Sequence, residues 1–201
     1  SEQIAGGNFA GGRTVDAMIS QIDLFPTLCE LLEIDKPSWL QGKSIMPVLD
    51  GAVAEINNEI FAEVSYPAAD EPQRAVRTRR YKYIRRYVAD HTGHNGPVLA
   101  NCDDSISKDV WLDAGWRERT IPNEQLYDLI FDPNETQNLA TAPQYQDILA
   151  EMRSRLQEWM QHTHDPILST DGHVPTPPGA ILNKIDATSP GETAGLFAVT
   201  V

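Results

Sequence analysis

The residues of this chain that could bind a metal ion gather in one polar segment. His91 and His94 are followed by Asp103 and Asp104, and imidazole and carboxylate groups are common zinc ligands. Metal sites built on helices or hairpins hold their ligands at characteristic spacings. These four residues straddle a loop and show no such spacing. We therefore expect them to be solvated loop residues rather than metal ligands.

Other groups that could take part in catalysis stand apart from one another. Cys29 lies within an apolar helical run, which is typical of a buried, inert thiol. Cys102 stands beside two aspartates, a setting that disfavours a reactive thiolate. His162 and His164 end a long helix, where the dipole favours a cation. The segment Gly11–Thr14 has glycines but lacks the Lys-Ser/Thr pair of a phosphate loop. No combination of Ser, His and acid stands out, so these residues alone indicate no active site.

A run of basic residues interrupts an otherwise acidic chain. The formal net charge is −13, so most of the surface would repel a phosphate backbone, which argues against general nucleic-acid binding. The basic segment could face an anionic ligand, or it could neutralise the acidic remainder of the protein. We favour the second interpretation. Its members are Arg74, Arg77, Arg79, Arg80, Lys82, Arg85 and Arg86, with no acid among them.

Two strands and a tight turn should position this basic segment. Residues 73–78 and 81–88 flank Arg79-Arg80, which is the spacing of a β-hairpin. In the second strand, alternate residues from Tyr81 to Tyr87 would point to one face of the sheet. Neither face is purely apolar, so another part of the protein should cover one of them.

The remaining patterns predict an α+β fold. Apolar residues recur at helical spacing over residues 144–162, so we expect a long helix whose apolar stripe faces the core. Strands are predicted over residues 60–64 and from Gln125 to the Asp-Pro-Asn turn at 132–134. With the hairpin they form a small antiparallel sheet of three or four strands, covered by the long helix. Residues 89–123 should be an irregular connection with a short helix near 108–114.

A partial α/β region should precede the sheet. A weak alternation predicts a strand over residues 15–22, and Asp23 is a suitable N-cap for the helix that follows. A shorter helix is expected over 45–49, closed by Gly51. No apolar run approaches the roughly 18 residues that a membrane span needs, so we expect no membrane partner.

Four strings of residues resemble, in the same order, landmarks of the C-terminal part of type I sulfatases, within the alkaline phosphatase superfamily. They are Val15–Leu28, Leu40–Gly51, Arg74–Ile84 and Leu126–Ala140. The end of the last string, together with Thr163–Pro166, is particularly similar to N-sulfoglucosamine sulfohydrolases, the heparan N-sulfatases. The resemblance implies three parts. Residues 1–66 would end the α/β catalytic domain, residues 67–168 would form a small C-terminal subdomain, and residues 169–201 would be an extended tail rich in proline and glycine.

The catalytic motif of that family is missing from this sequence. Sulfatases use a formylglycine, made from the first residue of a Cys/Ser-x-Pro/Ala-x-Arg motif, and a Ca²⁺ or Mg²⁺ ion. Neither Cys29 nor Cys102 is followed by that motif. The family's metal-binding aspartates and its catalytic Lys and His would stand upstream of Val15. The resemblance therefore implies a fragment with no catalytic residue, metal ligand or cofactor of its own, and its partner would be the N-terminal catalytic part of the same enzyme.

The resemblance also implies that two side chains of this chain bind substrate. In the family the C-terminal domain abuts the active-site cleft, so Glu63 and Arg74 are the expected substrate-binding residues. A carboxylate could accept hydrogen bonds from sugar hydroxyls or an amine, and an arginine could pair with a sulfate. The alternative is an internal ion pair between Glu63 and Arg74. Arg77 and Lys82 are expected to be structural.

The expected function is that of a sulfatase acting on sulfate esters or sulfamates, in particular of glycosaminoglycan-type sugars. The resemblance implies this activity for the complete enzyme, and we expect the 201-residue chain alone to be inactive. Two alternatives stay open. One is a related hydrolase of the same superfamily that acts on phosphonates or phosphodiesters. The other is a non-catalytic module that binds acidic glycans or mediates assembly through the basic hairpin.

Overall fold

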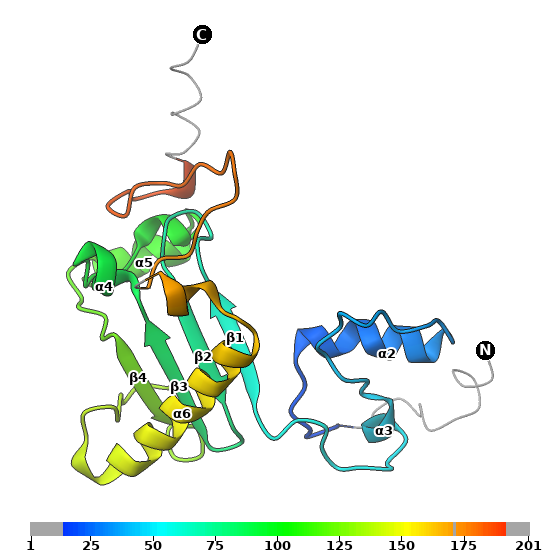
Figure 1. Cartoon of the computed structure of the whole chain (residues 1–201). Helices are drawn as coiled ribbons and strands as arrows, with labels where there is room; N and C mark the ends of the chain where they lie inside the picture. Colours follow the sequence, from blue (N-terminus) through cyan, green and yellow to red (C-terminus); the bar gives the residue numbers. More distant parts are fainter. Residues whose placement is uncertain (1–13, 171, 192–201) are drawn as a thin grey trace. The chain divides into compact units, whose positions relative to one another are not determined.

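The computed structural model describes residues 14–170 and 172–191, without the side chain of His91. The chain divides into two compact units (Figure 1). The first contains the residues up to Phe61 together with Arg77–Arg79, and the second contains Ala62–Val76 and the residues from Arg80 onward. Within the described ranges, no helix is long and apolar enough to cross a membrane.

Three short helical elements form the first unit. They are the 3-10 helix η1 (Gln21–Asp23) and the α-helices α2 (Leu24–Leu31) and α3 (Met46–Leu49). The two predicted helices are thus confirmed. The predicted role of Asp23 needs a correction, because its side chain makes no capping bond to α2. It accepts instead from the backbone N–H of Ser20, at 2.9 Å, and so closes the turn before the helix.

The buried carboxylate of Asp23 joins separate segments of this unit. Besides the bond to Ser20, it accepts from the backbone N–H of Lys43 at 2.8 Å and from Asn57 Nδ2 at 2.8 Å. The chain must approach closely here. A Cβ on Gly42 would lie 2.0 Å from the carbonyl oxygen of Ile22, so glycine is required by a backbone contact at this position.

The predicted strand over residues 15–22 is wrong. Residues 14–20 form no regular element, and η1 begins at Gln21. The reason is visible at Met18, whose backbone groups bond to side chains rather than to a neighbouring strand. Its N–H donates to Glu55 Oε1 at 2.6 Å, and its carbonyl accepts from Asn57 Nδ2 at 3.2 Å. Polar side chains therefore satisfy the extended backbone that a sheet would otherwise pair.

A four-stranded antiparallel sheet forms the second unit (Figure 1). Its strands follow one another in chain order and are β1 (Ile60–Val64), β2 (Gln73–Arg77), β3 (Tyr81–Arg86) and β4 (Glu124–Asp128). Strands β3 and β4 pair in a register that sets Tyr83 opposite Leu126. The predicted α+β class, the strand over 60–64 and the hairpin are confirmed. The second hairpin strand ends at Arg86, two residues earlier than predicted.

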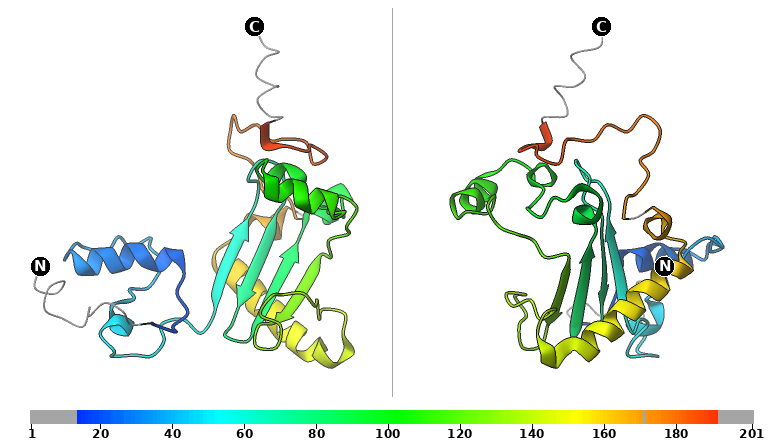
Figure 2. Two further views of the ribbon diagram at one scale, coloured as in Figure 1. Left: turned by 180° about the vertical axis from the view of Figure 1, so that it is seen from behind. Right: turned by 60° about the vertical axis from the view of Figure 1, so that its left-hand side comes forward.

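Helix α6 (Gln146–His162) runs diagonally across one face of this sheet (Figure 2). The short 3-10 helix η3 (Pro143–Tyr145) leads into it, and η4 (Pro166–Ser169) follows it. Four residues of the predicted apolar stripe are buried, each three or four positions from the last, so that stripe does face the core. These residues are Leu149, Met152, Leu156 and Met160.

The long connection between β3 and β4 carries three short helical elements. They are α4 (Val88–Thr92), η2 (Leu99–Asn101) and α5 (Ile106–Asp113). The predicted short helix corresponds to α5. A small cluster of Ala69, Val98, Ala100 and Ala187 joins this connection to the β1–β2 loop and to the late segment of the chain. An isolated bridge between Ala69 and Asn183 fixes the same contact.

The turn after β4 provides hydrogen-bond partners for backbone groups at the open edge of the sheet. Asp132 accepts from the backbone N–H groups of Thr136, at 3.0 Å, and Gln137, at 2.8 Å. Asn138 then pairs with the strand itself, because its Oδ1 accepts from Leu126 N at 3.0 Å and its Nδ2 donates to Glu124 O at 2.9 Å. A side chain thus takes the place of a fifth strand.

Candidate functional site

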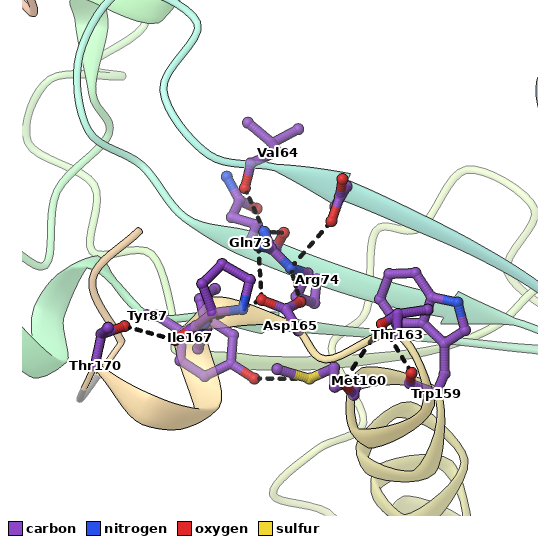
Figure 3. Close-up of polar contacts among 12 residues, drawn as sticks. Val64, Gln73, Arg74, Tyr87, Trp159, Met160, Thr163, Asp165, Ile167 and Thr170 are labelled. Atoms are coloured by element: carbon purple, nitrogen blue, oxygen red, sulfur yellow. Dashed lines mark hydrogen bonds and ion pairs between the residues drawn. The ribbon is translucent and has the colours of Figure 1, made fainter. Parts of the chain in front are cut away.

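The guanidinium of Arg74 is buried and is held by Asp165, an acid that follows helix α6. The side chain of Arg74 is 2% exposed. In Figure 3 it points at Asp165, to which Nε donates at 2.5 Å and Nη2 at 3.1 Å. Two parallel N–H···O bonds between arginine and a carboxylate make a strong and directional pair. The pair ties strand β2 to the segment that follows α6.

The remaining contacts of Arg74 fix the end of β1. Nη1 donates to the carbonyl of Val64 and to the carbonyl of Gln73, both at 2.9 Å. Asp165 is fixed in turn, since its Oδ1 accepts from Ile167 N at 3.1 Å at the start of η4. A buried charge is stable only when it is paired and hydrogen-bonded, and both conditions are met here.

Glu63 stands beside this buried pair and faces solvent. Its carboxylate Oε2 lies 3.5 Å from Arg74 Nε, and its side chain is 62% exposed. The two predicted substrate-binding residues thus lie together and form the ion pair that was the alternative to a substrate site. The two residues have different surroundings. The N–H groups of Arg74 donate to Asp165 and to backbone carbonyls within the protein. The exposed carboxylate of Glu63 can accept hydrogen bonds from a ligand in solution. Asp165, which holds Arg74, was not predicted as a site residue. No local signal in the sequence points to Asp165, because its partner lies 91 positions away.

The basic segment from Arg74 to Arg86 is paired internally. Six of its seven members have an acidic partner within 4.0 Å, which supports the neutralising interpretation. The pairs are Arg74–Asp165, Arg79–Glu55, Arg80–Asp128, Lys82–Glu135, Arg85–Asp90 and Arg86–Glu71. The exception is Arg77, for which the structure shows no such pair among the residues it describes. Hydrogen bonding to Arg80 holds the pKa of the Asp128 carboxyl below its ordinary value.

Among the residues that the structure describes, side chains that could bind a metal ion are not brought together. In residues 14–170 and 172–191 there is no group of three or more His, Cys, Asp or Glu side chains placed to hold a metal. His94 Nε2 lies 3.3 Å from the carbonyl of Pro97. Asp104 pairs with Lys108, at 2.9 Å, and also contacts Ser189. These two loop residues are therefore engaged in local contacts.

Comparison with known proteins gives this chain a family context. The family model described as N-sulphoglucosamine sulphohydrolase, C-terminal, matches residues 6–94. An ulvan-active sulfatase of Formosa agariphila is 28% identical over 186 residues, which cover 89% of this chain and 36% of the relative. The human N-sulphoglucosamine sulphohydrolase is 27% identical over 182 residues, covering 80% of this chain and 36% of the relative. The chain therefore spans about a third of the length of these relatives.

Solved structures agree with the sequence matches. A 2-O GAG sulfatase superposes with a TM-score of 0.51 at 29% identity, over 73% of this chain and 26% of the other. The phosphonate monoester hydrolase of Agrobacterium radiobacter has a TM-score of 0.52 at 21% identity, over 83% and 30% of the two chains. At that identity the second likeness concerns the fold alone.

Proposed function

Because this chain is a C-terminal sulfatase region, we propose that it is part of an enzyme that hydrolyses sulfate esters or sulfamates of sugars. Its own contribution would be to substrate binding rather than to the bond-breaking step. Two relatives support the choice of substrate class, since one is a sulfatase active on ulvan and the other acts on a sulphoglucosamine. Both are longer than this chain, which leaves room for the catalytic part elsewhere.

The reactive groups would come from the N-terminal catalytic part of the same enzyme. A sulfatase of this family would use formylglycine and a Ca²⁺ or Mg²⁺ ion. The described residues do not fit that metal, because they provide no group of three acidic, His or Cys side chains around one point. A hard cation takes six or more oxygen ligands, many of them carboxylates. We therefore assign no step of the reaction to residues of this chain.

The surface of the first unit supports such a partner. Several of its large apolar side chains are exposed, and Phe25 stacks on Trp39 with ring centroids 6.0 Å apart. A soluble protein rarely leaves so many apolar groups of one unit uncovered. We propose that the N-terminal catalytic part packs on them. These side chains are Ile22, Leu24, Phe25, Leu28, Leu32, Ile34 and Trp39.

The substrate contact is proposed for Glu63, with Arg74 as the residue that positions it. One observation carries this assignment. An exposed carboxylate lies 3.5 Å from a buried guanidinium that Asp165 and two carbonyls already hold. Direct binding of sulfate by Arg74 would require those bonds to break. Glu63 needs no such change to accept from sugar hydroxyls or an amine.

Replacing Glu63 by glutamine in the full-length enzyme should raise KM for a sulfated sugar about tenfold, because a charge-assisted hydrogen bond is worth roughly 1.5–3 kcal/mol. Turnover of a small aryl sulfate, which lacks the sugar, should change little. Steady-state kinetics with both substrates measure the difference. Glu118→Gln, another exposed acid, is the matched control. An unchanged KM for the sulfated sugar would remove Glu63 from the substrate site.

The two alternatives have less support. The likeness to a phosphonate monoester hydrolase is one of fold, whereas the sequence relatives named above are sulfatases. A glycan-binding module built on the basic hairpin would need free cations, yet Arg74 is buried and five of its neighbours are paired with acids.

A further inference from the structure

A groove of about 660 Å³ lies between strand β3 and helix α6. Two rows of side chains line it. One row is Tyr83, Arg85 and Tyr87, at alternate positions, and the other is Arg153, Gln157 and Gln161, one helical turn apart. Eight residues of helix separate the ends of the second row, or about 12 Å. The volume falls within the ~300–1,000 Å³ range of ligand sites, and the two rows of lining side chains suit an elongated ligand.

A hydrogen-bond network centred on Glu124 holds the side chains at one end of the groove. Tyr83 Oη donates to Glu124 Oε1 at 2.5 Å, and Arg153 Nε donates to the same oxygen at 2.6 Å. Hydrogen bonding to Arg153 lowers the pKa of the Glu124 carboxyl, while burial raises the pKa of the Tyr83 phenol. Glu124 therefore stays ionised and Tyr83 stays protonated near neutral pH, so this network keeps its arrangement.

The side chains of Gln157 and Gln161, which also line the groove, are exposed to solvent. In the part of the chain that the structure describes, the side-chain amides of Gln157 and Gln161 make no hydrogen bond. Each amide carries two N–H donors and an acceptor oxygen, which matches a hydroxyl that both donates and accepts. The floor is apolar, because Leu156 and Met160 are almost fully buried beneath the two rows.

Charges along the groove balance. Arg85 and Arg153 are offset by Glu124 and Glu158, which also line it, and Arg85 is further paired with Asp90. A groove without net charge does not select an anion. Its ligand should instead offer hydroxyl groups at its edges and apolar C–H faces to the floor.

We propose that the groove between β3 and α6 binds an unsulfated stretch of a saccharide chain, with Gln157 and Gln161 as the hydroxyl-binding residues. The preference for a saccharide among polyhydroxylated ligands rests on the proposed function. The site itself rests on the groove and its free amides. It would hold a part of the glycan that Glu63 does not contact.

The test is a titration of the ¹⁵N-labelled chain with a heparin-derived tetrasaccharide and with its desulfated counterpart. Both should shift the side-chain NH₂ signals of Gln157 and Gln161, with similar affinity. The double variant Gln157→Ala/Gln161→Ala should bind about tenfold more weakly, since two hydrogen bonds are lost. Alanine favours a helix, so α6 should be kept. Gln144→Ala, an exposed glutamine on η3 outside the groove, should bind normally.

Two results would overturn the inference. One is that neither saccharide moves the Gln157 and Gln161 signals. The other is that the sulfated probe alone binds and salt removes it, which would indicate general attraction to basic residues. The outcome is independent of the Glu63→Gln kinetics. A groove that binds nothing leaves the proposed function standing, and an unchanged KM in Glu63→Gln leaves the groove standing.

Discussion

Replacing Asp165 by alanine should lower the free energy of unfolding of the second unit by about 3–5 kcal/mol. Removing one partner of a buried ion pair leaves the other charge uncompensated, and Arg74 is 2% exposed with both of its Asp165 bonds inside the protein. Urea unfolding, followed by far-ultraviolet circular dichroism, measures the loss. The exposed loop variant Asp103→Ala is the control and should stay within about 0.5 kcal/mol of the parent.

The same experiment separates two roles for Arg74. The double variant Arg74→Met/Asp165→Leu should recover most of the stability, because apolar groups of similar volume can replace a buried ion pair at little cost. A loss below about 1 kcal/mol in Asp165→Ala would contradict the structural role, since a loss of that size is typical of an exposed pair. Arg74 would then be free to meet a ligand.

Replacing Leu149 by alanine should cost about 2–5 kcal/mol of unfolding free energy, the range for removing a large side chain from a packed core. Leu149 is 1% exposed and lies in the buried row of α6. The same unfolding measurement applies. Leu168→Ala, at a leucine that is 42% exposed, is the matched control and should cost clearly less. Equal losses in the two variants would mean that α6 does not cover the sheet through this row.

Local patterns were sufficient for the elements that carry the site. The strand over residues 60–64 and the hairpin follow from alternation and turn spacing, and α6 follows from its apolar stripe. Each of these signals lies within one segment of sequence.

Contacts between segments that are far apart in the chain could not be predicted from the sequence. Arg74 and Asp165 are 91 positions apart, and neither residue type indicates which partner it will meet. The strand predicted over 15–22 failed for a related reason, because Glu55 and Asn57 supply the bonds that a neighbouring strand would otherwise make. The groove between β3 and α6 depends on how two elements pack, so its two rows could be recognised only together.

The basic residues of the hairpin have two structural roles. Most of its arginines, and Lys82, form ion pairs with acidic residues of the fold. Arg74, held by Asp165, also donates a hydrogen bond to the carbonyl of Val64 at the end of β1. Glu63 is thereby held at a defined place on the exposed side of that strand. We propose that the small sheet supports the substrate contacts and that the chemistry takes place on the N-terminal catalytic part.

The most direct measurement of this account compares hydrolysis of an aryl sulfate by the 201-residue chain and by the full-length enzyme, each with Ca²⁺ or Mg²⁺ added. We expect turnover by the full-length enzyme and none by this chain. Metal-dependent turnover by the 201-residue chain alone would contradict the account, because the reactive groups would then have to lie within it.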